Sequence, residues 1–287
     1  MDFAFNEEQE ELRSMARAFL EENSGSEQVR KAMESDLGYD PEVWRQIGAE
    51  LGWTSVHIPE AYGGLGLGYV ELVALMEIMG GSLLCAPFFS SVCLAANALL
   101  VAGSEAQKCE YLPGIAAGTT RATLAYTGAG GGWDASSIEV TAVREGDDFV
   151  LRGTTMFVVD GHCADLLIVA ARSPGSVGSD GVTMFVVPGD SEGLRRNPLP
   201  TMDLTRRLAE IEWDGVRLPE SAILGEEGAG GPKLSRILDL AVIALAAEQV
   251  GGAQRCLDLA VAYAKQREQF GRPIGSFQAI KIGRAHV

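Results

Sequence analysis

The chain has 287 residues, a hydrophobic content of 47% and a formal net charge of −16. A chain of this length can bury a large core, and we expect it to form two or three lobes. The negative charge argues against binding to nucleic acid or insertion at an anionic membrane, because both need an excess of Lys and Arg. No apolar stretch approaches the length that spans a membrane.

The cysteines and the start of the chain give information about the cellular compartment of the protein. Residues 1–20 follow an amphipathic pattern with acidic residues and lack a basic start with an apolar core, so they do not resemble a signal peptide. The cysteines are odd in number, scattered and without a CxxC pair, which predicts reduced core residues in a cytoplasmic protein and argues against a metal site. They are Cys85, Cys93, Cys109, Cys163 and Cys256.

Residues 1–118 are predicted to form an all-helical domain. Asn6 is suited to cap an amphipathic helix, and Asp40 before a proline marks another helix start. The glycine-rich stretch IPEAYGGLGLG follows no strand and lacks GxGxxG spacing, which favours a turn between helices over a phosphate cradle. The apolar run 70–103 predicts buried helices interrupted around Pro87.

Residues 119–225 have a different periodicity. Short β-branched or alternating segments are separated by Gly and Asp turns, which predicts a small antiparallel β-barrel or sandwich. These segments are RATLAYT, SIEVTAV, DFVLRGTTMFVV, DLLIVAAR, VTMFVV and AEIEWDGVRL. Two basic pairs, Arg195–Arg196 and Arg206–Arg207, predict either contacts with anionic phosphates or a solvated strand edge.

Residues 226–287 are predicted to begin a C-terminal helical bundle. From Lys233 apolar residues recur at helical spacing over a long run. Gly251 and Gly252 in its middle weaken the helix but allow close packing against a neighbour.

A tight turn is expected at the end of this helix, where Gly271 and Pro273 stop it. Arg267, Gln269 and Gln278 bracket the turn. A planar cation and two amides are suited to a pyrophosphate or an adenine edge. The alternative is an ordinary solvated helix end.

The stretch REQFGRPIGSFQAIK resembles the signature of the acyl-CoA dehydrogenase family, whose members carry RxQFGxPIxxFQ at the end of this helix. The helix connection around IPEAYGGLGLG, the loop AYTGAGGGWD, the strand GDDFVLRGTTMFVV and the segment LAEIEWDGVRLPESAIL also resemble family motifs, so the resemblance covers most of the chain. It implies an α+β protein with an N-terminal helical domain, a middle β domain and a C-terminal helical bundle that is incomplete here.

The resemblance also implies FAD and an oligomer, a homo- or hetero-tetramer. Thr127 matches a family Thr that reaches the flavin ring, Phe157 takes the place of a Trp that packs on the ring, and Val159 stands where a Thr bonds near the reactive flavin nitrogen. Residues of the C-terminal turn would contact the FAD held by a neighbouring subunit; they are Arg267, Gln269, Phe270 and Gln278.

Several positions depart from the family pattern. Gly128 and Ala129 stand where Glu and Pro are usual, and Trp133 replaces a Ser that helps to shape the acyl thioester pocket. We expect Trp133 to reshape or block part of that pocket. Arg206 lies in a segment that runs along the CoA cleft in the family, and DLTRR resembles divergent bacterial members, including those acting on sterol side chains.

No catalytic residue is named from the sequence. Most family members place the Glu base beyond the FQAIK segment, past residue 287, so we expect this chain to be inactive alone. A minority place the base on the long helix, where this chain has Ala241 followed by Val242. Glu248, two turns further on, is favoured for helix packing or a polar pocket over a role as base.

The last residues, KIGRAHV, match what a widely used sequencing-library adapter encodes in one reading frame. Our hypothesis is that native sequence ends near Lys281 and that residues 282–287 are not native.

The predicted function is that of an FAD-dependent acyl-CoA dehydrogenase in fatty acid or sterol side-chain catabolism, which removes an α-proton, transfers the β-hydrogen to flavin and passes electrons to an electron-transfer flavoprotein. The alternative is a non-catalytic partner subunit that contributes to a neighbour's FAD site. A third candidate, a flavin-dependent oxidase or monooxygenase, fits less well because the CoA-type DxVxLP segment is kept.

Overall fold

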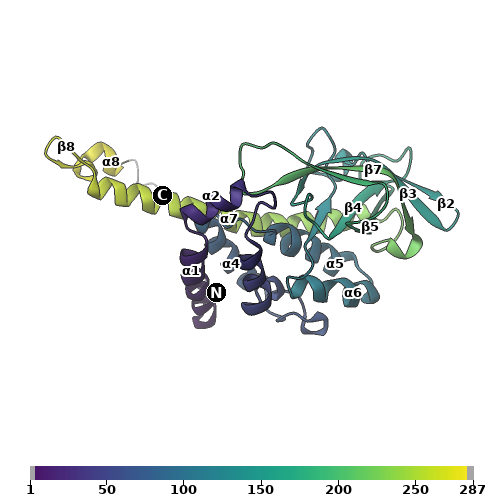
Figure 1. Ribbon diagram of the computed structural model, residues 1–287, viewed down its shortest axis with the longest axis horizontal. Coiled ribbons are helices and arrows are strands. Elements are labelled where there is room, and N and C mark those ends of the chain that lie inside the picture. The colour runs from purple at the N-terminus through teal and green to yellow at the C-terminus, as the bar shows by residue number, and fades with distance from the viewer. Residues whose placement is uncertain (1–3, 283–287) are drawn as a thin grey trace.

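The computed structural model describes residues 4–282. A helical lobe packs beside a curled β-sheet, and one long helix, α7 (Gly230–Gln266), runs past both and extends beyond them (Figure 1). The α+β organisation expected from the sequence is confirmed. The divisions expected near residues 118 and 225 fall in segments that connect helices to strands.

The helical lobe begins where the caps predicted it. Asn6 accepts a hydrogen bond from the Gln9 backbone at 2.8 Å, and Asp40 accepts one from Glu42 at 2.9 Å. The α-helices are Glu7–Asn23 (α1), Ser26–Glu34 (α2), Pro41–Arg45 (α3), Tyr69–Ser82 (α4), Asn97–Ala102 (α5) and Glu105–Ala116 (α6). Shorter helical turns are Gln46–Glu50 (η1), Trp53–Ser55 (η2), Glu60–Tyr62 (η3) and Phe89–Ala96 (η4).

The apolar run is interrupted where the sequence predicted. Helix α4 ends at Ser82, Leu83 adopts a left-handed conformation with φ 50°, and helical structure resumes at Phe89 in η4. All of η4 is buried, as is about half of α4. The glycine-rich segment after η3 forms turns, as predicted.

The β domain is a seven-stranded sheet in the order β1-β4-β2-β3-β7-β6, with β5 pairing to β4. Its pairs are mostly antiparallel, but β1 runs parallel to β4, with Leu124 opposite Ile168. The strands are Ala122–Ala125 (β1), Thr141–Glu145 (β2), Asp148–Val159 (β3), Leu166–Arg172 (β4), Val182–Pro188 (β5), Leu194–Pro198 (β6) and Leu208–Pro219 (β7). Helical turns Ala135–Ser137 (η5) and Glu220–Ala222 (η6) lie in its connections.

The hydrophobic core consists of two main clusters, and strand β4 contributes alternate residues to each of them. In β4, Leu167 and Val169 face the inside of the curled sheet, whereas Leu166 and Ile168 pack with the helical lobe. Strands β4 and β5 are therefore buried on both faces, which explains their continuous apolar sequences.

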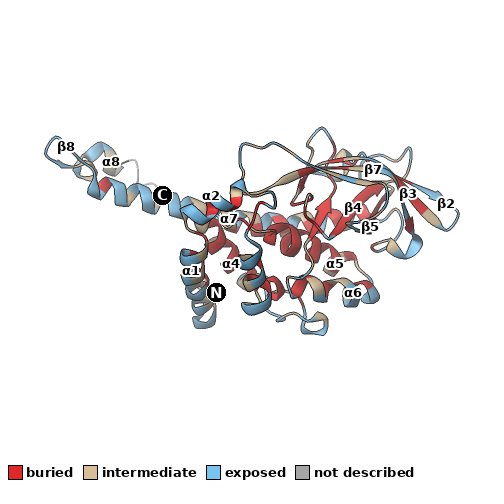
Figure 2. Ribbon diagram, viewed as in Figure 1, coloured by how far each residue is buried: buried red, intermediate tan, exposed pale blue. Residues whose placement is uncertain are grey.

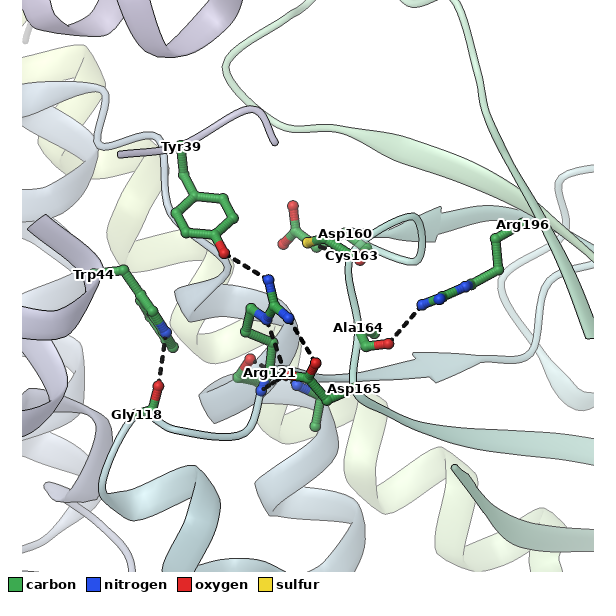
Figure 3. Close-up of polar contacts among 11 residues, drawn as sticks. Tyr39, Trp44, Gly118, Arg121, Asp160, Cys163, Ala164, Asp165 and Arg196 are labelled. Carbon is green, nitrogen blue, oxygen red and sulfur yellow. Dashed lines mark hydrogen bonds and ion pairs between the residues drawn. The ribbon is translucent and has the colours of Figure 1, made fainter. Parts of the chain in front are cut away.

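Hydrogen bonds around Arg121 join the helical lobe to the β domain (Figure 3). Arg121 pairs with Asp165 through two guanidinium nitrogens at 2.6 and 2.9 Å, and it donates to the Tyr39 hydroxyl at 2.7 Å. The Trp44 indole donates to the Gly118 carbonyl at 2.8 Å. These bonds connect the loop after α2, helix α3 and the first and fourth strands.

Helices α4 and α7 cross with their backbones in contact. A Cβ added at Gly251 would lie 1.7 Å from the Glu77 carbonyl oxygen, and one at Gly80 would lie 2.0 Å from the carbonyl oxygen of Glu248. At Gly252 the nearest atom would be 3.7 Å away. The close packing predicted for the glycine pair is thus confirmed for Gly251 only.

Helix α7 ends earlier than predicted. Its last residue is Gln266, and Arg267 is already extended, so Gly271 and Pro273 do not stop the helix. Gly271, with φ 73°, is instead one of the two left-handed residues, with Phe270, in the turn of the hairpin of β8 (Glu268–Gln269) and β9 (Arg272–Pro273). A turn, Ile274–Ser276 (η7), and a short helix, Gln278–Ile282 (α8), follow. Residues 283–287, which carry most of the hypothesis of a non-native ending, lie outside the described residues.

The cysteine prediction was partly wrong. Cys85, Cys93 and Cys163 are buried, but Cys109 on α6 and Cys256 on α7 are exposed, because each lies on the solvent side of its helix. Within residues 4–282 no group of three or more His, Cys, Asp or Glu side chains is arranged to hold a metal ion. No helix in this range has the length and apolar character needed to cross a bilayer.

Candidate functional site

The first group of predicted site residues lies where β1 and β3 end. Phe157 has a left-handed backbone with φ 58°, and the residue is 43% exposed. Across from it, a Cβ added at Gly131 would lie 3.6 Å from the Phe157 ring. An aromatic ring is thus presented at the surface beside a glycine loop, which is suited to packing against a flat aromatic ligand.

Thr127 and Val159 are held next to this ring by backbone bonds. The Met156 N–H donates to the Thr127 carbonyl at 2.8 Å, which ties the loop after β1 to the residue before Phe157. The Thr123 hydroxyl donates to the Val159 carbonyl at 2.6 Å. The structure therefore brings together the three residues that the sequence placed at a flavin ring.

The loop that departs from the family pattern is packed against its own chain. A Cβ at Gly128 would lie 2.4 Å from the Ser137 carbonyl oxygen, so the usual Glu could not occupy this position without a shift of the loop. Trp133, further along the loop, is 76% exposed. Its predicted effect on an acyl pocket remains a prediction.

The second group lies at the tip of α7. Arg267, Gln269 and Gln278 are exposed, and Phe270 is 92% exposed with a left-handed φ of 55°. Phe270 meets Phe277 edge to face with ring centres 6.2 Å apart. A cation, amides and an aromatic ring thus share one corner that residues 4–282 do not cover.

The corner at β8 and α8 lies at one end of the molecule (Figure 1), whereas the end of β3 lies beside the middle of α7, where Arg206 pairs with Glu248. The corner at β8 and α8 is carried away from the sheet by the outer half of α7, which is largely exposed (Figure 2). The exposed side chains there include large apolar ones, among them Val250, Leu259 and Tyr263. One chain therefore does not bring both groups to a single ligand.

Arg206 and Glu248 form an ion pair. Their side chains approach to 2.5 Å, and the Arg206 guanidinium lies 4.8 Å above the Phe89 ring. Arg206 is thus already engaged within the protein, and its predicted contact with substrate remains a prediction. The polar-pocket role favoured for Glu248 agrees with this pairing, and Ala241, the alternative base position, is a buried alanine.

The other predicted basic residues also have partners within the chain. Arg207 donates to the carbonyls of Met33 and Ser35 at 2.6 and 3.1 Å. Arg195 lies on the edge strand β6 and pairs with acids of β7, whereas Arg196 donates to the Ala164 carbonyl at 2.7 Å. The interpretation as a solvated strand edge therefore fits Arg195, whereas Arg196 is half-buried.

A buried carboxyl next to the site was missed in the sequence. Asp160 directly follows Val159, has φ 52°, and accepts a hydrogen bond from the buried Ser90 hydroxyl at 2.7 Å. Burial raises the pKa of the Asp160 carboxyl to about 6, against the opposing effects of Ser90 and of the Arg206 charge. A single Asp in VVDG gives no sign of this partner 70 residues away.

Family models cover nearly the whole chain. Residues 6–119 match the acyl-CoA dehydrogenase N-terminal domain, residues 123–216 match the middle domain, and residues 229–287 match the C-terminal domain.

Individual proteins agree with these models. The chain is 35% identical to the acyl-CoA dehydrogenase IpdE2 of Mycolicibacterium smegmatis over 96% of this chain and 70% of that protein. The ChsE4–ChsE5 complex of Mycobacterium tuberculosis superposes with a TM-score of 0.86 at 29% identity, covering 98% of this chain and 73% of that one. A glutaryl-CoA dehydrogenase of Mycobacterium smegmatis in complex with FADH2 gives a TM-score of 0.86 at 26% identity, covering 97% and 70%.

Proposed function

Because the chain belongs to the acyl-CoA dehydrogenase family of FAD-dependent oxidoreductases, we propose that it takes part in the α,β-dehydrogenation of an acyl-CoA thioester. When bound, FAD accepts the β-hydrogen of the substrate as hydride. Thr127, Phe157 and Val159 would hold the ring at the edge of the sheet. The exposed ring of Phe157 and the adjacent glycine loop fit a flat aromatic group.

The observation that carries this proposal is the separation of the two groups by a single rigid helix. Helix α7 begins at the sheet, where Ala229 forms a bridge with Val182, and continues for 37 residues. The ring residues lie beside the middle of the helix, where Arg206 pairs with Glu248. At 1.5 Å per residue the stretch from Glu248 to Gln266 is roughly 27 Å long, so Arg267 does not reach the Phe157 of its own chain. We therefore assign the corner of Arg267, Gln269, Phe270 and Gln278 to the FAD of an adjoining subunit.

The oligomer is proposed to be a tetramer of identical or homologous chains. In a two-fold arrangement each chain would contribute its corner to the partner's ring site, which makes the exchange reciprocal. The exposed apolar side chains on the outer half of α7 support an assembly that covers them. Electrons would leave to an electron-transfer flavoprotein, and a cytoplasmic location is part of the proposal.

A second candidate is a partner subunit that does not itself dehydrogenate substrate. Three observations favour it: a buried alanine at position 241, a Glu248 already paired with Arg206, and a Val159 without a hydroxyl. The similarity to the ChsE4–ChsE5 complex, which joins two differently named proteins, is consistent with this candidate. In either case the corner at Arg267 would serve a neighbouring flavin.

Complementation between subunits tests the shared site. Phe157→Ala and Arg267→Ala each damage one half of the site, so each variant alone should lose bound FAD, measured by visible absorbance. Co-production of the two variants should restore FAD to part of the sites, because mixed pairs contain one intact combination. Lys265→Ala, an exposed cation near the same corner, is the control and should retain FAD. No restoration in the mixed sample would contradict a site shared between chains.

The addition of acyl-CoA distinguishes the two candidate functions. The protein is produced alone and together with the homologous proteins encoded beside it, and acyl-CoAs are added without an electron acceptor. Loss of visible flavin absorbance in the protein alone supports a dehydrogenase. Flavin binding and bleaching only in the mixed complex support a partner subunit.

A further inference from the structure

The Arg172 side chain, at the end of β4, binds main-chain carbonyl groups of two separate loops. Its Nε atom donates to the Ile138 carbonyl at 2.8 Å, and Nη2 donates to the Ala135 carbonyl at 2.6 Å, both in the loop after β1. The guanidinium also donates to the carbonyls of Ser176 and Gly178, in the loop after β4, at 2.9 and 3.0 Å. One planar cation therefore holds four carbonyls of two loops, which suits the fixed five-donor fork of Arg.

The loop after β1 has little else that fixes its position. No residue from Ala129 to Ser137 is buried, so apolar packing does not anchor this stretch. Among residues 4–282 outside the loop, only Arg172 forms hydrogen bonds to positions 128–138. Between its two ends, the position of the loop relative to the rest of the protein therefore depends on this one side chain.

The turn bound by Arg172 supports the glycine part of the loop. Ser137 lies between the two bonded carbonyls, and its hydroxyl donates to the Gly132 carbonyl at 2.9 Å. A Cβ added at Gly132 would lie 2.7 Å from the Ser137 Cβ, so the turn and the glycines are in direct contact. The neighbouring Gly131 lies beside the Phe157 ring. A displacement of the turn would therefore move the glycines relative to this ring.

The second loop joins the same arrangement to the start of α7. A Cβ added at Gly231, in the first turn of α7, would lie 2.4 Å from the Ser179 carbonyl oxygen. One added at Gly230 would lie 2.9 Å from the Val182 carbonyl oxygen. The loop after β4 is therefore packed directly on the base of α7. Through Arg172, the glycine loop is fixed relative to α7 as well as to the sheet.

We propose that Arg172 is a positioning residue of the flavin site, whose guanidinium holds the glycine loop beside Phe157 in the place that a flat ring requires. This inference rests on the proposed function. A loop that is already ordered favours binding, because the cost of ordering it is not paid when the ligand arrives. Lysine cannot fill this role completely, because an ammonium group lacks the planar fork that reaches four carbonyls.

The first test is a titration of FAD, followed by flavin fluorescence, into the wild-type protein and its variants. Arg172→Ala should weaken FAD binding by roughly 10- to 100-fold, because two hydrogen bonds to the loop are lost, and Arg172→Lys should cause a smaller loss. Arg152→Ala is the control and should not change the affinity, because the Arg152 side chain on β3 is 64% exposed and pairs with Asp214 at the surface. Equal affinity of Arg172→Ala and the wild-type protein would overturn the proposal.

Added guanidinium ions distinguish a positioning role from a general loss of structure. At millimolar concentrations, far below those that unfold proteins, guanidinium should restore part of the FAD affinity of Arg172→Ala, because it can bind the same carbonyls. The same concentration of sodium chloride should have no such effect. Arg172→Lys should not respond, because its side chain fills the place of the ion. Restoration by both salts, or by neither, would contradict the assigned role.

Hydrogen exchange separates this inference from the proposed function. If the wild-type protein binds no FAD, the proposed function fails, and control of the loop by Arg172 is still decided by amide exchange followed by mass spectrometry. In Arg172→Ala, exchange should become faster in residues 128–138 and 173–181 and stay unchanged in β3. Unchanged exchange in both loops, or faster exchange throughout the β domain, would overturn the inference. If Arg172→Ala does not fold, Arg172→Lys should show the same local change to a smaller extent.

Discussion

Replacing Asp160 by Asn should stabilise the protein at neutral pH. The carboxyl is buried and its pKa is raised from 3.8 to about 6, because burial penalises the charged form more than Ser90 and Arg206 favour it. Asn keeps an oxygen that can accept the bond from the Ser90 hydroxyl, which is 2.7 Å long in the native protein. Asn also tolerates the left-handed φ of 52° at this position.

The expected magnitude follows from the pKa. A rise of about two pH units corresponds to about 3 kcal/mol between the protonated and ionised forms. Because the folded pKa of Asp160 lies above the unfolded one, the folded state binds this proton more tightly, and stability falls as the pH rises from about 4 to about 6. Above about pH 6 the full cost is present, and Asn removes it.

Urea unfolding at several pH values between 4 and 8 measures this effect. The free energy of unfolding of Asp160→Asn should match that of the wild-type protein near pH 4 and exceed it by about 3 kcal/mol near pH 7.5. Ser90→Ala is the control, because loss of its hydrogen bond should move the pH-dependent window upward. A difference that does not vary with pH, or an Asn variant that is less stable at pH 7.5, would refute the reasoning.

Three further predictions concern the α4–α7 crossing, the contacts of Arg121 between the helical lobe and the β domain, and the loop that carries Trp133. Gly251→Ala should lower the free energy of unfolding by about 1–3 kcal/mol, because the α4–α7 crossing has no room for a methyl group. Gly252→Ala should raise it by up to about 1 kcal/mol through helix propensity. Equal effects of the two variants in urea unfolding would contradict the close crossing. Arg121→Met should lower the free energy of unfolding by about 1–2 kcal/mol in the same assay, and Arg195→Ala, at an exposed ion pair, by less than about 0.5 kcal/mol. A smaller loss for Arg121→Met would show that the contact between the helical lobe and the β domain does not depend on Arg121. Trp133→Ser should widen the range of acyl-CoAs that bind, measured by calorimetry, and an unchanged range would contradict a role in the pocket.

Local patterns in the sequence predicted most of the fold. The cap at Asn6 and the break around Pro87 depend on neighbouring residues only, so they can be identified from short stretches. The strands followed from alternation and β-branched composition. The parallel pairing of β1 with β4 could not be predicted, because it joins segments more than 40 residues apart whose register is set by burial on both faces.

The candidate site was less predictable where its contacts are distant in sequence. The pairing of Arg206 with Glu248 and of Ser90 with Asp160 joins residues 42 and 70 positions apart. Sequence spacing gives no information about such pairs, so the partner of Arg206 could not be identified from a short stretch. The exposure of Cys256 was missed for a related reason, since the apolar positions of α7 do not tell which of its faces meet another helix within residues 4–282.

Helix α7 separates the residues proposed for the chain's own flavin site from those proposed to complete a neighbour's FAD site, so the two proposed roles can be tested separately. The residues assigned to a flavin ring and the Arg206–Glu248 pair lie near the sheet, whereas the Arg267 corner lies beyond the outer half of the helix. Substitutions at the sheet end, such as Gly128 or Val159, therefore leave the geometry of the distant corner unchanged. Under the proposed function, a chain of this fold that has lost its own substrate chemistry would still complete a neighbour's site, and the complementation experiment examines the two ends independently.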